Sequence, residues 1–360
     1  MFDLRTSPFY LLSVSPRDNR AIIAQATETA ISEGTLDETA ATRAQQVLMA
    51  PRLRLGAELS WLPGLAPNRV KNLIEEATLS ADLICGLPLL AGANLAAYRC
   101  SSKASPVHHE LLFRFYERRN DNDILSLVNA ERRAGNFPEV TLDLLQEVMP
   151  DVTQQHTASF IEFITREPWP GSALLSILKE YFVDGSNVIG FLDEIAQRFV
   201  DWAATSFQQA EEAITRALTE IQEKPASLSE HLPAFSAAIG VWASMAAPHQ
   251  FILAKRHVSD PRTERLLSKI RGICLHLNNE VGDAKTPLAL TQAAVPAFEG
   301  SPTHLDQVKA DLKILEERVS DHDVFQAIKP LAEFVTDLNS QHSDCADLLG
   351  EEILSEMVTG

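Results

Sequence analysis

Four potential metal ligands lie within six residues near the end of the sequence, at His342, Asp344, Cys345 and Asp347. Imidazole, carboxylate and thiolate groups are the usual protein ligands of zinc. On a helix, His342 and Cys345 would share one face, and the two aspartates would share another. A structural zinc site needs further thiolates or a second ligand pair, and no neighbouring motif supplies them. The sequence therefore predicts no metal centre and no cofactor, and it leaves open whether this cluster binds a metal.

A second group of chemically active side chains is His108-His109-Glu110. Adjacent positions on a helix point about 100° apart, so one metal ion could not easily meet both imidazole rings. Because Pro106 precedes the group, we expect a solvated helix start.

The longer catalytic motifs are missing from the sequence. It contains no GxGxxG, GxxxxGK[ST], GxSxG or HExxH string, and these are the strings that mark dinucleotide, phosphate, nucleophile-elbow and zinc-protease sites. We therefore predict no catalytic residues and no enzymatic activity. An enzyme whose site is assembled from scattered residues remains an alternative.

Charge and composition restrict the classes of partner. The 360 residues carry 31 basic and 49 acidic side chains, a net charge of −18, and no basic run interrupts the excess of acids. Such a chain repels phosphates, so we expect no direct nucleic-acid partner. The hydrophobic fraction of 45% is that of a folded globular protein.

Membrane and redox signals point to the cytoplasm. The amino terminus lacks a basic start and an apolar core of secretory length. The most apolar stretch, residues 233–247, is shorter than the roughly 20 residues that cross a bilayer. The four cysteines form no CxxC pair, as is typical of reduced, buried thiols.

Helical periodicity dominates the elements that must position these residues. Asp260 and Pro261 predict a helix start, apolar residues then recur every three or four positions from Leu266 to Val281, and Gly282 predicts the end. A similar apolar face runs through residues 187–223. Near the end, an a/d stripe predicts a helix packed against a neighbour; its members are Leu305, Val308, Leu312, Leu315 and Val319.

We expect an all-α protein, because no segment alternates as a strand would. Proline, glycine and serine clusters suggest three parts, at residues 1–64, 65–225 and 226–360. The helix–turn–helix rhythm after residue 105 suits a tetratricopeptide-like or solenoid-like array, which would leave an extended binding surface.

Residues 8–62 resemble a J domain, the co-chaperone module of the DnaJ class, in a degenerate form. Phe9-Tyr10-Leu11-Leu12-Ser13-Val14 resembles its short first helix. Residues 19–32, with Asp18 as expected N-cap, and residues 37–49 would be its second and third helices. Ala50-Pro51-Arg52-Leu53-Arg54 stands where J domains carry Asp-Pro-x-x-Arg at the start of helix four.

The resemblance extends less specifically beyond residue 62. Residues 128–140 (Val-Asn-Ala-Glu-Arg-Arg-Ala-Gly-Asn-Phe-Pro-Glu-Val) and residues 271–280 resemble segments of bacterial J-like proteins that carry helical-repeat tails. The charges of Glu131, Arg132 and Arg133 predict a helix C-terminus at which the two cations lie near the negative end of the helix dipole. A docking corner formed with Asn136-Phe137-Pro138 is the alternative.

One departure from the family separates the expected fold from the expected activity. J domains activate a DnaK-type partner through His-Pro-Asp in the loop after helix two, and residues 32–36 contain no such tripeptide. The family's basic face on helix two is reduced to Arg17 and Arg20. The resemblance therefore implies a J-like fold without the standard stimulation of an ATPase.

These observations favour a non-enzymatic adaptor or scaffold that binds another protein, in a bacterial system linked to chaperones, stress or defence. The alternatives are a co-chaperone of a dedicated DnaK-like ATPase and an unrecognised enzyme. An acidic chain would suit a basic or mixed-charge partner. The expected partner-binding residues are Arg17, Arg20, Glu211, Glu212, Asp306, Glu316 and Glu317.

Overall fold

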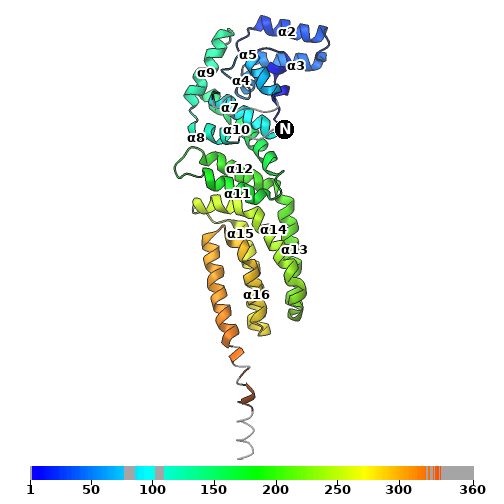
Figure 1. The fold of residues 1–360 in the computed structure, drawn as a ribbon, viewed down its shortest axis with the longest axis vertical. Helices are drawn as coiled ribbons and strands as arrows, with labels where there is room; N and C mark the ends of the chain where they lie inside the picture. The colour runs from blue at the N-terminus through cyan, green and yellow to red at the C-terminus, as the bar shows by residue number, and fades with distance from the viewer. Residues whose placement is uncertain are drawn as a thin grey trace, which may run out of the picture. The chain divides into compact units, whose positions relative to one another are not determined.

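The computed structural model describes residues 2–76, 86–101 and 109–321, together with positions 323, 324, 327, 329–331 and 333. These residues form helices joined by turns and short loops, and none of them lies in a strand. The all-α prediction is confirmed (Figure 1). The α-helices are α1 (Pro8–Leu11), α2 (Arg20–Ser32), α3 (Glu38–Met49), α4 (Pro51–Leu59), α5 (Pro67–Glu75), α7 (Leu89–Ser101), α8 (Glu110–Arg118), α9 (Asp121–Ala134), α10 (Leu142–Ile164), α11 (Pro170–Tyr181), α12 (Ile189–Trp202), α13 (Ala204–Glu223), α14 (Leu228–Lys255), α15 (Pro261–His276) and α16 (Lys285–Ala294).

The chain divides into two compact units. The first comprises residues 1–208 and 244–258, and the second comprises residues 209–243 and 259–360. These limits differ from the expected parts at 1–64, 65–225 and 226–360: no limit falls after residue 64, and α13 and α14 each contribute to both units.

Side-chain caps determine where the first helices begin. The side chain of Asn19 accepts hydrogen bonds from the backbone amides of Ala21 and Ile22 and so caps α2. The expectation that Asp18 is this cap is wrong: its carboxylate instead accepts from the amide of Ser15, at 2.7 Å, and closes the preceding turn. Asp37 caps α3, as the expected start at that residue implies.

Helices α7 and α10 form the centre of the first unit. Every residue of α7 from Leu90 to Ser101 is buried, as expected for a helix enclosed on all sides. The 23-residue α10 packs against α7, α12, α4 and α9. The first four helices and the later ones therefore share one hydrophobic core.

One glycine marks a very close helix contact in this unit. A Cβ atom added to Gly171, at the start of α11, would lie 1.9 Å from the backbone oxygen of Ser244 in α14. Glycine is required here because no side chain fits between the two backbones.

The second unit confirms the predicted helix signals. Asp260 caps α15 by accepting from the Arg262 amide, and the helix continues as a π-helical turn, Leu277–Val281. Gly282 ends it with a φ of 73°. On the helix over 302–321, Val308 and Leu315 are buried and the other members of the predicted stripe are partly buried.

Two expected elements differ in length. The apolar face over 187–223 belongs to two helices, α12 and α13, which meet at Ala203. The apolar stretch 233–247 belongs to α14, which has 28 residues. In the described part of the chain, the segment Pro225–Lys255 is the one helix long and apolar enough to cross a bilayer by length and composition, a test that the core helix of a soluble protein also passes.

Candidate functional site

A buried ionic cluster joins the first helices to α9. Glu58, on α4, accepts a hydrogen bond from Arg54 Nε at 2.7 Å through one carboxylate oxygen and from Arg132 Nε, also at 2.7 Å, through the other. Each of the three residues is only 1% exposed. Arg54 and Glu58 lie four residues apart on α4, whereas Arg132 comes from α9.

Backbone carbonyl groups complete the cluster. The Arg54 guanidinium donates to the oxygens of Leu48 and Pro16, and its carbon lies 3.5 Å from the centre of the Phe137 ring. Arg132 donates to the oxygens of Pro51 and Pro138. Burial raises the pKa of Glu58 and lowers that of Arg54, and the attraction between the charges opposes both shifts.

The residues around Glu131 form the rim of this cluster. Glu131 accepts from the Gly64 amide at 2.9 Å and pairs with Arg17 at 3.6 Å. The next turn places Gly135 against the backbone, because an added Cβ would lie 3.1 Å from the oxygens of Pro16 and Asp18. Arg132 and Arg133 lie in the last turn of α9, as the helix-end interpretation predicts. Glu131 and Arg132 are in addition buried, and both contact residues that precede position 65. The docking-corner alternative stays a prediction.

The two cations expected to bind a partner also lie at this corner. Arg17 has an exposed side chain but contacts Glu131, and Arg20 lies over the Phe137 ring at 5.4 Å. Both residues stabilise the packing of the turn before α2 on the turn after α9.

A second buried polar group is a series of hydrogen bonds that connects α7, α8 and α10. His156 Nε2 lies 2.7 Å from Asn94 Oδ1, and its Nδ1 lies 2.9 Å from the Tyr116 hydroxyl. The amide nitrogen of Asn94 donates to the oxygens of Leu59 and Trp61. Complete burial lowers the pKa of His156 to about 3 and raises that of Tyr116, so both groups stay uncharged.

His109 differs from the expected solvated helix start. It is half-buried, stacks on Phe163 at 6.0 Å and contacts the edges of Phe113, Phe160 and Tyr181. His108 and the cluster His342, Asp344, Cys345 and Asp347 lie outside the described residues. Among the residues that are described, no group of three or more potential ligands could hold a metal ion.

The acidic residues expected to bind a partner are all exposed in the second unit. Glu211 accepts a hydrogen bond from Trp242 Nε1 at 3.4 Å, and Glu212 beside it also has a partner. Asp306, Glu316 and Glu317 lie on the helix over 302–321, away from its buried stripe. Arg17 and Arg20 belong to the first unit, and these five acids belong to the second.

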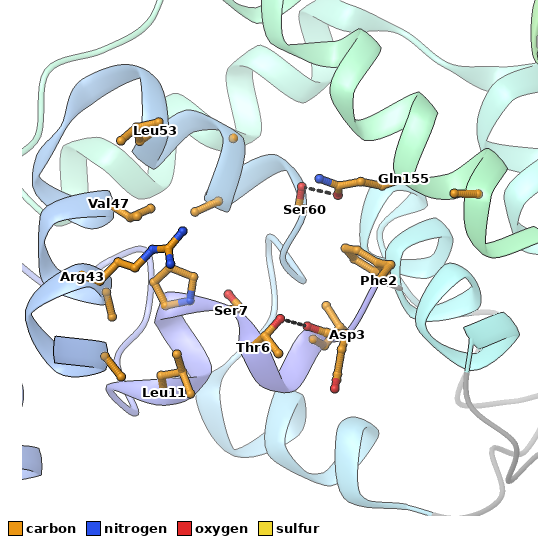
Figure 2. Close-up of a pocket in the computed structure, with 17 residues that line it drawn as sticks. Phe2, Asp3, Thr6, Ser7, Leu11, Arg43, Val47, Leu53, Ser60 and Gln155 are labelled. Carbon is orange, nitrogen blue, oxygen red and sulfur yellow. Dashed lines mark hydrogen bonds between the residues drawn. The ribbon is translucent and has the colours of Figure 1, made fainter. Parts of the chain in front are cut away.

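One hollow beside the first helices is a solvent-open pocket with a volume of about 670 Å³ (Figure 2). The amino-terminal segment, α3, α4 and α10 line it. Most of its wall is apolar, and on α3 and α4 much of the wall consists of small side chains. The apolar lining comprises Phe2, Leu4, Pro8, Leu11, Ala40, Ala44, Val47, Leu53, Gly56, Ala57 and Ala158.

The polar groups of the pocket are few. Thr6 Oγ1 donates to the backbone oxygen of Asp3, and Ser60 Oγ donates to Gln155 Oε1 at 2.9 Å. The Ser7 hydroxyl and the Arg43 guanidinium point into the hollow (Figure 2). No histidine or cysteine lines the pocket, so no hydroxyl there has the imidazole base that usually activates a nucleophile.

Sequence reasoning missed Glu58, Arg43 and Ser7. For Glu58 a signal existed. Arg54 and Glu58 lie four residues apart, each next to a leucine of the buried face of α4, Leu55 or Leu59. Arg43 and Ser7 belong to no sequence motif, because only the folded chain brings the amino-terminal segment beside α3.

Comparison of the chain with protein-family models, with curated proteins and with solved structures finds no significant match.

Proposed function

We propose that the chain is a non-enzymatic adaptor that binds another protein, with a degenerate J-like head built into its first compact unit. One observation carries the proposal: the pocket of Figure 2 has the apolar wall and sparse polar groups of a binding site, and its hydroxyls lack an imidazole base. The described buried ionisable groups support it too, since Glu58, Arg132 and His156 connect helices to one another.

The J-like part of the proposal is supported by the positions of the helices. The expected second and third helices, residues 19–32 and 37–49, correspond to α2 and α3, which pack on each other, and α4 follows at Pro51. The exposed positions of α2 carry a single base, Arg20, and this residue is engaged by Phe137. An acidic DnaK-type surface would find little charge to bind there.

A co-chaperone of a dedicated DnaK-like ATPase is the second candidate. Its support is the turn between α2 and α3, where residues 32–35 are all exposed, at the place where a J domain carries its His-Pro-Asp loop. A partner adapted to this sequence would have to recognise something other than His-Pro-Asp.

The test uses the full chain as bait in chemical crosslinking and affinity capture in its native host, followed by titration of each purified candidate against the purified chain. We expect one protein to bind in a saturable manner without turnover of any substrate. Stimulated ATP hydrolysis by a captured DnaK-like protein would favour the second candidate. Failure of every captured protein to bind after purification would contradict the adaptor function.

Variants of the full chain locate the interface. Arg43→Glu changes the pocket, and the triple variant Asp306→Lys, Glu316→Lys, Glu317→Lys reverses the exposed acids of the second unit. Binding through the second unit should weaken in the triple variant and with rising salt, because exposed charges are screened within about 8 Å at physiological ionic strength. Deletion of residues 1–62 is unsuitable, since it removes Glu58 and leaves Arg132 buried without its carboxylate.

A further inference from the structure

The pocket of Figure 2 holds a buried hydroxyl without a partner and an exposed cation without an ion pair. Ser7 is the N-cap of α1, yet its side chain makes no capping hydrogen bond, and its buried hydroxyl oxygen has no partner among the described residues. Buried hydroxyls without partners are rare and costly, so this one needs an explanation. The hydroxyl points into the hollow (Figure 2).

Arg43 is the second group, and its side chain is exposed. It extends from α3 into the same hollow (Figure 2). Within the described part of the chain its guanidinium makes no ion pair or hydrogen bond.

The one acid in the lining does not neutralise this cation. Asp3 uses a carboxylate oxygen to accept the Arg5 amide at 2.9 Å, as the cap of the turn Leu4–Thr6. The pocket therefore presents two groups suited to an anion, a guanidinium and a hydroxyl. A planar guanidinium binds a carboxylate through two parallel hydrogen bonds.

The wall around these groups is suited to a peptide. Leu53 is 56% exposed and Val47 is partly buried, and both lie on the wall near Arg43. Ala40 and Ala44 of α3, with Gly56 and Ala57 of α4, are small enough to let another backbone approach. The volume of about 670 Å³ lies within the range of established ligand pockets.

We propose that this pocket binds a protein segment in which an Asp or Glu carboxylate stands beside small aliphatic side chains. The carboxylate pairs with Arg43 and accepts a hydrogen bond from Ser7, and the aliphatic side chains cover Leu53, Val47 and Leu11. This inference deepens the proposed adaptor function, because it names the chemistry of the partner segment.

The test is a selection from a displayed library of random peptides on the immobilised full chain, in wild-type form and as Arg43→Glu. Selection on the wild type should enrich peptides with an acid next to Leu, Val or Ala. Selection on Arg43→Glu should enrich a base at that position, because the charge in the pocket is reversed. Arg69→Glu is the matched control, since Arg69 is exposed on α5, outside the pocket.

Affinities of the best synthetic peptide complete the test. Arg43→Glu should weaken binding at least about tenfold, and Ser7→Ala several-fold, whereas Arg69→Glu should bind as the wild type does. Ser7→Ala should leave the unfolding midpoint unchanged or raised, because the removed hydroxyl has no partner. This combination separates loss of binding from loss of folding.

Three outcomes would overturn the inference. These are enriched peptides without an acid, equal peptide affinity for Arg43→Glu and the wild type, and no enrichment of any peptide. None of them would disprove the adaptor function, whose own test is binding of a purified partner protein.

Discussion

At the residue scale, the central feature is the carboxylate of Glu58 held between Arg54 and Arg132. Three charges are desolvated together, and the attraction between them, with the carbonyl groups of Pro16, Leu48, Pro51 and Pro138, offsets that cost. A cluster of this kind is sensitive to the removal of one member, because the remaining charge stays buried.

Truncation of Arg132 measures this sensitivity. We expect Arg132→Ala to lower the free energy of unfolding by about 3–5 kcal/mol, because Glu58 then lacks one of its two cations. Arg133→Ala, the neighbouring control, should change it by less than about 1 kcal/mol, because Arg133 pairs with Glu139 at the surface. Urea unfolding followed by circular dichroism measures both, and equal effects would contradict the account of the cluster.

His156 gives a prediction about pH. Its folded pKa of about 3 lies below the ordinary value of 6.5, so the unfolded chain binds more protons between these values. The stability that a neutral His156 contributes is complete above pH 6.5 and is lost as the pH falls toward 3, at up to about 1.4 kcal/mol per pH unit.

The measurement is the difference in unfolding free energy between the wild type and His156→Gln across this pH range. The difference should shrink as the pH falls, because glutamine does not titrate. A difference that stays constant with pH would mean that His156 protonates normally in the folded chain. His276→Gln is the control, since His276 is partly exposed beside Glu280.

At the element scale, local signals predicted some helices well and could not predict how the helices join. Asp260, Pro261 and Gly282 define the limits of α15 and its π-helical turn, because caps depend on neighbouring backbone groups. Asp18 and Asn19 are both good caps, so the sequence could not decide between them.

The candidate site was beyond this local reasoning. Glu58 and Arg132 are separated by 74 positions, and no spacing rule connects them. The pocket around Arg43 likewise depends on the amino-terminal segment lying beside α3 and α4. Arg17 and Arg20, which the J-domain resemblance suggested as partner-binding cations, contact other parts of the chain.

Gly171 tests how closely α11 and α14 approach each other. We expect Gly171→Ala to destabilise the protein by about 3 kcal/mol or more, because the new methyl group would overlap the Ser244 oxygen. Gly190→Ala, near the start of α12, should be neutral or stabilise by up to about 1 kcal/mol, since nothing lies within 4 Å of its added Cβ. Thermal unfolding of both variants checks this, and a stable Gly171→Ala would show that the two helices are farther apart.

At the scale of the whole molecule, the first four helices are part of a larger core. Leu48, Leu55 and Leu59 belong to the same buried cluster as residues of α7 and α10. We therefore expect a chain beginning at residue 63 to lose cooperative folding of its first unit, because Asn94 and Arg132 lose their partners in the removed part. Hydrogen exchange read by mass spectrometry would show α7 and α10 unprotected in this truncated chain. Protection equal to that of the full chain would mean that the head is an independent domain.

Net charge is distributed unevenly along the sequence. Residues 301–360 carry 4 basic and 13 acidic side chains, which is half of the net charge of −18. If the proposed adaptor function holds, this part of the chain would attract a basic or mixed-charge partner over a long range.

The most direct test of the adaptor account is hydrogen exchange of the full chain with and without its purified partner protein. The account predicts slower exchange in the segments that line the pocket, residues 2–11, 40–47 and 53–60, and loss of this protection in Arg43→Glu but not in Arg69→Glu. Protection confined to the second unit, or unchanged by Arg43→Glu, would contradict it.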